Sequence, residues 1–202
     1  MTALAGGPPL VVLVGPPGAG KTTVATALAR RLGTRLRDTD EDIERLAGRT
    51  VAEIFVESGE DHFRALERRA VAVALAEHPG VLALGGGAVM APATQEALRG
   101  HRVVFLDVGV AKATRRVGLD APRPLLVGSP RARWIELMAR RRPVYEAVSV
   151  LRVDTDERTV AQVAQAVVDG LGLTGGSDLA DGSGPLDGSG PVDSNASEQG
   201  TT

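Results

Sequence analysis

The stretch GPPGAGKT, residues 15–22, constrains the fold of this chain more than any other feature. It matches the pattern G-x-x-x-x-G-K-[ST] and directly follows a short apolar run, 10–14. The segment after it has helical periodicity, with Val24, Leu28 and Leu32 at i, i+4 and i+8. A strand, a glycine-rich turn and a helix in this order are typical of a phosphate-binding loop, in which backbone N–H groups at a helix N-terminus surround a phosphate.

The phosphate loop predicts a site for a nucleoside triphosphate. Lys21 is expected to reach the β- and γ-phosphates, and the Thr22 hydroxyl is expected to bind Mg²⁺. Of the 23 basic residues only Lys21 and Lys112 are lysines, so a lysine here does not simply reflect a lysine-rich composition. Neither follows an Asn, so the guanine-reading N-K-x-D is absent, which argues against a GTPase. The residues expected to contact the nucleotide are Gly18, Ala19, Gly20, Lys21, Thr22 and Thr23.

Short apolar runs alternate with helical patterns as far as residue 173. The runs 81–84, 103–108 and 150–154 read as strands, and helices are expected over about 50–57, over about 60–77 and after Thr159. This alternation predicts an α/β fold, with a parallel sheet covered by helices on both faces and a ligand site at the carboxyl ends of the strands.

The composition separates a globular body from a tail. Residues 174–202 are rich in Gly, Ser and Asp, repeat DGSGP twice and contain no basic residue, so we expect a disordered acidic tail. The net charge of −2 gives no signal for nucleic acid. The first residues have no basic segment before the apolar run, and no apolar stretch approaches the ~20 residues of a membrane helix. We expect a soluble, cytoplasmic protein that binds neither membrane nor nucleic acid.

Two acids and three glycines are candidates for the chemistry. Asp38 and Asp40 stand at i and i+2, so on extended backbone both would point toward the phosphate loop. One could hold Mg²⁺ through water while the other accepts a proton from an attacking hydroxyl; alternatively, the same acids could simply begin a helix. Gly85–Gly87 end a strand where many phosphate-loop proteins place the metal-binding acid, and Asp107, at the end of another strand, is an alternative metal ligand by pattern.

Arginines supply the expected positive charge. Arg64 and Glu67 are three residues apart on a predicted helix, where they could form an ordinary surface ion pair. Arg123 lies in a stretch punctuated by Pro and Gly, about 118–132, that has the composition of a mobile lid. A lid excludes water from a transferring phosphoryl group, and an arginine on it would stabilise the charge of that group.

The phosphate loop, DTD, FRALE, LALGGGAV, RPLL and RRRPVYEAV occur together in the order found in shikimate kinases. Over about residues 10–171 the chain resembles this family. The resemblance implies a phosphate-loop, three-layer α/β fold with a five-stranded parallel sheet of order 2-3-1-4-5 and a lid. It also implies ATP-dependent, Mg²⁺-assisted phosphorylation of the 3-hydroxyl of shikimate, giving shikimate 3-phosphate and ADP in aromatic amino-acid biosynthesis.

The resemblance further implies a role for each matching residue. Asp40 would contact the shikimate hydroxyls and act as the base, with Lys21 and Arg123 as the other catalytic residues, and Asp38 would bind the metal through water, together with Thr22. Arg64, held by Glu67, and Arg141 would bind the shikimate carboxylate, while Gly85, Gly86 and Gly87 would present bare backbone and N–H donors to the acceptor. Arg123 would bind the ATP phosphates, and Arg116 and Arg158 would lie along the adenine. Because three arginines are consecutive, Arg140 and Arg142 are alternatives to Arg141.

Two other functions compete with this one. A related kinase acting on gluconate would also need a carboxylate-binding site, although DTD together with LGGGAV favours shikimate. A non-catalytic nucleotide-binding regulator would bind ATP without forming ADP in response to an acceptor. We expect a monomer in either case.

Overall fold

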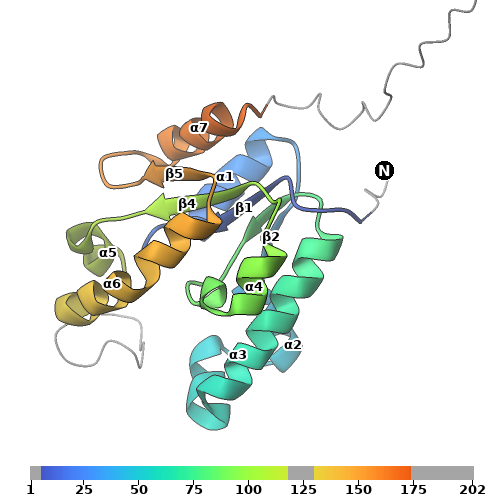
Figure 1. Cartoon of the computed structure of the whole chain (residues 1–202), viewed down its shortest axis with the longest axis vertical. Helices are drawn as coiled ribbons and strands as arrows, with labels where there is room; N and C mark the ends of the chain where they lie inside the picture. The colour runs from blue at the N-terminus through green and yellow to red at the C-terminus, as the bar shows by residue number, and fades with distance from the viewer. Residues whose placement is uncertain (1–5, 118–129, 174–202) are drawn as a thin grey trace, which may run out of the picture.

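The computed structural model describes residues 6–117 and 130–173 (Figure 1). The predicted tail, 174–202, lies outside these ranges. So do Arg123 and residues 118–129 of the predicted lid.

The described residues form a five-stranded parallel sheet. Its strands are β1 (Val11–Val14), β2 (Leu36–Asp38), β3 (Val81–Ala83), β4 (Val103–Asp107) and β5 (Leu151–Asp154). Their order is β2-β3-β1-β4-β5, and every neighbouring pair is parallel. The expected α/β fold and the order 2-3-1-4-5 are therefore confirmed.

Helices cover both faces of this sheet, as Figure 1 shows with α6 in front of it and α1 behind it. The helical elements are α1 (Lys21–Arg31), α2 (Thr39–Ala47), α3 (Val51–Glu77), η1 (Ala88–Met90), α4 (Pro92–Ala97), α5 (Val110–Val117), α6 (Pro130–Val148) and α7 (Val160–Leu171). The two helices expected over 50–57 and 60–77 form a single element, α3, with a kink at Gly59, where φ is 82°. Thr50 begins α3 with the predicted capping box to Glu53.

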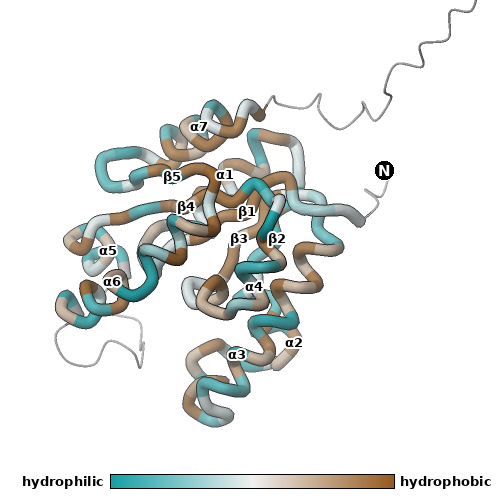
Figure 2. The backbone as a smooth tube through the Cα atoms, in the orientation of Figure 1, coloured by the Kyte–Doolittle hydropathy of each residue, from teal (hydrophilic) through white to brown (hydrophobic). Residues whose placement is uncertain are grey.

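The core is aliphatic because the chain has few aromatic residues. Val, Leu and Ala of β1, β3 and β4 are almost completely buried, and Figure 2 shows these strands as a hydrophobic centre. A continuous apolar run, rather than an alternating one, is what a parallel strand covered on both faces requires. Phe105 of β4 and Tyr145 of α6 stack with their ring centroids 5.1 Å apart, which ties α6 to the sheet.

Within the described ranges, no helix is both long enough and apolar enough to span a bilayer.

Candidate active site

The turn between β1 and α1 has the geometry of a phosphate loop. Gly15, Gly18 and Gly20 have φ of 148°, 84° and 84°, a region that favours glycine. A Cβ on Gly15 would lie 2.5 Å from the Leu106 carbonyl oxygen, so the loop also needs glycine for space. The Lys21 ammonium donates to the carbonyl oxygens of Gly15 and Pro16, at 3.0 and 3.3 Å, and so folds back over the loop.

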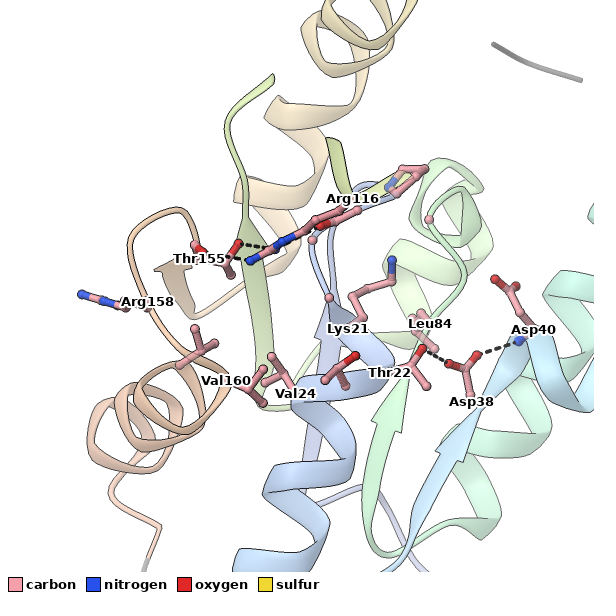
Figure 3. Close-up of a pocket in the computed structure, with 17 residues that line it drawn as sticks. Lys21, Thr22, Val24, Asp38, Asp40, Leu84, Arg116, Thr155, Arg158 and Val160 are labelled. Carbon is pink, nitrogen blue, oxygen red and sulfur yellow. Dashed lines mark hydrogen bonds between the residues drawn. The ribbon is translucent and has the colours of Figure 1, made fainter. Parts of the chain in front are cut away.

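A pocket of about 530 Å³ opens over this loop at the carboxyl ends of the strands (Figure 3). Its lining includes all six residues predicted to contact the nucleotide, together with Asp38, Asp40, Gly86, Arg116, Thr155 and Arg158. In Figure 3 Lys21 stands between Arg116 on one side and the acid pair on the other. The pocket therefore combines a phosphate-binding backbone with both signs of charge.

The acid pair is brought together by a helix N-terminus and not by extended backbone. Asp38 ends β2 and caps α2, its Oδ1 accepting from the Asp40 N–H at 3.0 Å, while Asp40 is already helical. The expectation that the two acids point the same way along a strand was therefore wrong, and the alternative of a helix start is correct. Both acids still line the pocket, and Asp38 Oδ2 accepts from the Thr22 hydroxyl at 2.8 Å.

Asp40 is the electrostatically unusual member of the pair. Its Oδ1 is buried and makes no hydrogen bond within the part of the chain that the structure describes. Burial first, and then the negative charge of Asp38, raise the pKa of Asp40 to about 6, although Lys21 acts in the opposite direction. A carboxylate with such a pKa is suited to accepting a proton near neutral pH.

The three glycines make room for the charged side chains around them. A Cβ on Gly85 would lie 2.4 Å from Asp40 Oδ1, and a Cβ on Gly87 would lie 2.3 Å from Arg64 Nη1. The Gly85 N–H already donates to the Thr39 hydroxyl at 3.0 Å, so the expectation that this N–H is available to an acceptor was wrong. A side chain at Gly85 or Gly87 would have to displace the acid or the arginine from its present position.

Arg64 is held by two acids of α3. Its Nη1 donates to Glu67 at 2.7 Å, and its Nε and Nη2 donate to Glu60 at 3.2 and 3.0 Å. The Glu67 side chain is only 4% exposed, so the pair is not the ordinary surface pair considered from the sequence. Burial raises the pKa of Glu67, and the Arg64 guanidinium opposes that rise. The predicted link between Glu67 and Arg64 is present.

The three consecutive arginines of α6 have three different environments. Arg140 is exposed and pairs with Glu136 one turn earlier. Arg141 Nη1 donates to the Gly86 carbonyl oxygen at 2.8 Å. Arg142 instead pairs with Asp107, so only Arg141 reaches the glycine turn.

The carboxylate of Asp107 is occupied by other partners and does not serve as a metal ligand in this site. Its carboxylate is buried and accepts two hydrogen bonds from Arg142, each of 2.7 Å, and further bonds from Arg152 and the Val108 N–H. It is not among the residues that line the pocket. The alternative that Asp107 is the metal acid was therefore wrong.

The other end of the pocket is built by the loop after β5. Arg116 of α5 donates to the Gly18 carbonyl oxygen at 3.1 Å and to the backbone oxygen of Thr155 at 3.4 Å. Arg158 is exposed and also lines the pocket. The two arginines predicted for the adenine thus share one end of the pocket, opposite the acid pair.

Sequence reasoning missed three residues that shape the site. Thr39 accepts from the Gly85 N–H, the Tyr145 hydroxyl donates to the Gly86 carbonyl oxygen at 2.5 Å, and Thr155 accepts from Arg116. Thr39 and Tyr145 lie inside the motifs DTD and RRRPVYEAV, which was the available signal. Nothing local to Thr155 pointed to its contact with Arg116 or to its place in the lining of the pocket.

Comparisons with known proteins agree on one family. A family model described as Shikimate kinase matches residues 17–171. The shikimate kinase of Thermobifida fusca is 56% identical over 167 residues, which cover 83% of this chain and 97% of that protein. The shikimate kinase of Streptomyces coelicolor is also 56% identical, over 82% of this chain and 96% of that protein.

Solved structures of shikimate kinases also match this chain. Shikimate kinase from Acinetobacter baumannii in complex with shikimate is 35% identical, with a TM-score of 0.76 over 81% of this chain and 92% of that chain. Shikimate kinase from Bacteroides thetaiotaomicron is 32% identical, with a TM-score of 0.70 over 81% of this chain and 98% of that chain. With its phosphate loop, its sheet order and these relatives in agreement, the chain belongs to the shikimate kinase family.

Proposed function

We propose that this chain transfers the γ-phosphoryl group of ATP to the 3-hydroxyl of shikimate, giving shikimate 3-phosphate and ADP, a step of aromatic amino-acid biosynthesis. One observation carries the proposal. The buried oxygen of Asp40, which has no hydrogen bond within the described ranges, lies beside a glycine turn that also contacts Arg64 and Arg141. A base and two carboxylate-binding cations thus meet next to the phosphate loop.

The phosphate loop binds the nucleotide in this proposal. Residues 18–23 place their backbone around the β- and γ-phosphates, and Lys21 carries a positive charge to the group that moves. Arg116 and Arg158 border the opposite end of the pocket, where the adenine would lie. The γ-phosphate is thereby directed toward Asp40.

Arg64 and Arg141 bind the acceptor carboxylate. A planar guanidinium can donate two parallel hydrogen bonds to a carboxylate, and it keeps its charge at any physiological pH. Glu67 holds Arg64 from its buried side, and the Gly86 carbonyl oxygen holds Arg141. An uncharged polyol would have no need of such a pair.

Asp40 accepts the proton of the attacking hydroxyl. Its raised pKa makes the carboxylate a stronger base than an exposed aspartate, and at pH 7 most molecules still carry it ionised. As the oxygen–phosphorus bond forms, the hydroxyl proton moves to Asp40, and the γ-phosphoryl group leaves ADP.

Thr22 and Asp38 fit a Mg²⁺ ion. Mg²⁺ commonly takes one or two protein oxygens and completes its shell with water and substrate phosphates, so a hydroxyl and a single carboxylate 2.8 Å apart are a suitable donor set. When bound, the ion would neutralise charge on the phosphates. The exclusion of water by the lid and the binding of the ATP phosphates by Arg123 are proposed from the sequence motif alone.

We further propose that the protein acts in the cytoplasm and as a monomer. The chain has no cysteine and so needs no oxidising compartment for disulfides, and the phosphate loop and the two acceptor arginines assigned above all lie on one chain. Size-exclusion chromatography with light scattering would test the monomer.

The proposal is tested by measuring ADP release from ATP and Mg²⁺ with shikimate, with gluconate and with no acceptor. Release that depends on shikimate alone is expected. Release with gluconate would favour the related sugar-acid kinase. A protein that binds ATP but forms no ADP with either acceptor would instead be a nucleotide-binding regulator.

A further inference from the structure

Arg142 and Asp107 form an ion pair that connects α6 to the sheet. Both guanidinium nitrogens Nη1 and Nη2 donate to Asp107, one to each carboxylate oxygen, at 2.7 Å. The Asp107 side chain is only 6% exposed, while the Arg142 side chain is 34% exposed, so the acid is shielded from water and the arginine is half-buried. Paired hydrogen bonds of this kind fix the orientation of the guanidinium as well as its distance.

The same stretch of α6 carries the groups that reach the glycine turn. Arg141 and Tyr145 both donate to the Gly86 carbonyl oxygen, at 2.8 and 2.5 Å. The Tyr145 ring stacks on Phe105, and the Arg142 guanidinium lies 5.8 Å from the centroid of that same Phe105 ring. Arg142, Phe105 and Tyr145 therefore form one packed unit whose two ends are Asp107 and Gly86.

We propose that Arg142 is a positioning residue for the acceptor site. By binding Asp107 at the end of β4, it sets the rotation of α6 so that Arg141 and Tyr145 both meet the Gly86 carbonyl oxygen. The inference rests on the proposed function, since Arg141 is assigned to the acceptor carboxylate only there. Arg142 itself needs no contact with substrate.

Replacing Arg142 does not leave Asp107 unpaired, because Asp107 keeps another arginine partner. Arg152 of β5 donates to Asp107 from Nε at 2.9 Å, and its Nη2 forms an ion pair with the same carboxylate at 2.6 Å. The buried carboxylate would thus remain paired in an Arg142→Ala variant, which avoids the large cost of an isolated buried charge. Changing Asp107 itself would leave two arginines without their acid, so it is the less informative variant.

The chain offers matched controls for this experiment. Arg140→Ala removes a neighbouring arginine from the same helix, but that side chain is 78% exposed and pairs with Glu136. Arg152→Ala removes the other partner of Asp107, and with it only one long contact to α6, the ion pair of 3.9 Å with Glu146. The kcat and the KM for shikimate and for ATP are measured for each variant and for the wild type.

We expect Arg142→Ala to raise the KM for shikimate about tenfold, because Arg141, one residue away, would be displaced from its contact with the acceptor carboxylate. The KM for ATP should change less than about twofold. Arg140→Ala should change neither constant. Arg142→Lys keeps the charge but cannot form the paired hydrogen bonds, so it should raise the KM for shikimate by an intermediate amount. It replaces Arg142→Ala in the experiment if the Ala variant folds poorly.

A double-mutant cycle separates positioning from general destabilisation. If Arg142 acts through Arg141, then Arg142→Ala should lower kcat/KM for shikimate in the wild type but hardly at all when Arg141 is already Ala. The ratio kcat/KM is used because it can be measured even when shikimate does not saturate the variant.

The outcomes distinguish the inference from the proposed function. No shikimate-dependent ADP release by the wild type would overturn both. An active wild type whose shikimate KM is unchanged by Arg142→Ala, or whose ATP KM rises equally, would overturn only the positioning role. Full additivity of the two arginine substitutions would do the same.

Discussion

Replacing Asp40 with Asn should make the free protein more stable while removing its activity. The pKa of Asp40 is raised from 3.8 to about 6, by burial first and then by Asp38. Because the folded state favours the protonated form, ionisation of Asp40 above this pKa costs folding free energy that an ordinary aspartate would not cost. The neutral amide of Asn does not ionise, so the substitution removes the cost.

The magnitude follows from the two pKa values. At about 1.4 kcal/mol per pKa unit, the cost approaches about 3 kcal/mol at and above about pH 8. It shrinks as the pH falls through the folded pKa, to about 1 kcal/mol near pH 4.5, and disappears below the unfolded pKa. Asp40→Asn should therefore stabilise the protein most at alkaline pH and least in acid.

Urea unfolding of wild type and Asp40→Asn, at several pH values from about 4.5 to 8 and without nucleotide, measures this difference. Asp61→Asn is the matched control, since it removes one exposed negative charge and should change the unfolding free energy only slightly. The same Asp40→Asn preparation should lose about 10²- to 10⁴-fold in phosphoryl transfer, because an amide cannot accept the hydroxyl proton. The reasoning is refuted if Asp40→Asn is no more stable than wild type at about pH 8, or if its advantage does not change with pH.

The remaining predictions concern the phosphate loop, the acceptor arginine, the glycine turn and the tail. Lys21→Ala should abolish ADP formation by removing a charge from the γ-phosphate, and near-normal turnover would contradict the assignment of the loop. Arg64→Leu should raise the KM for shikimate at least tenfold more than the KM for ATP, roughly the loss of a charged hydrogen bond, and equal changes would remove Arg64 from the acceptor site. Gly87→Ala should likewise weaken the binding of shikimate and leave the binding of ATP unchanged, because the new Cβ would lie 2.3 Å from Arg64 Nη1. Steady-state kinetics that match wild type would show that Arg64 can move without affecting shikimate binding. Ending the chain at residue 173 should leave kcat, KM and the melting temperature unchanged, and a lower melting temperature would show that the tail contributes to folding.

The fold was predictable because its signals are local and repeated. The phosphate loop stands between a buried strand and an amphipathic helix, and the later apolar runs became β3, β4 and β5 within one residue of the expected bounds. The sheet order came from the resemblance, since no local pattern determines which strands pair. The kink at Gly59 agrees with two expected helices, because a glycine with φ of 82° interrupts α3 between them.

The site was predictable in its residues but not in their contacts. Asp38 and Asp40 were expected on extended backbone, yet Asp38 caps α2, which begins at Thr39 and already includes Asp40. Spacing alone could not show that Glu67 is buried, because its burial depends on segments distant in sequence. The pairing of Asp107 with Arg142 and Arg152 joins three elements, so Asp107 resembled a metal ligand until the structure showed its partners.

The central claim is that the phosphate loop, Asp40 and the two acceptor arginines serve one reaction, the transfer of phosphate from ATP to the 3-hydroxyl of shikimate. Its most direct test is to incubate the full chain with ATP, Mg²⁺ and shikimate and to analyse the product by ³¹P and ¹H NMR. The account predicts one new phosphate ester whose phosphorus couples to the proton at carbon 3, formed in equal amount to ADP. A phosphate on another hydroxyl, or ADP accompanied only by inorganic phosphate, would contradict it.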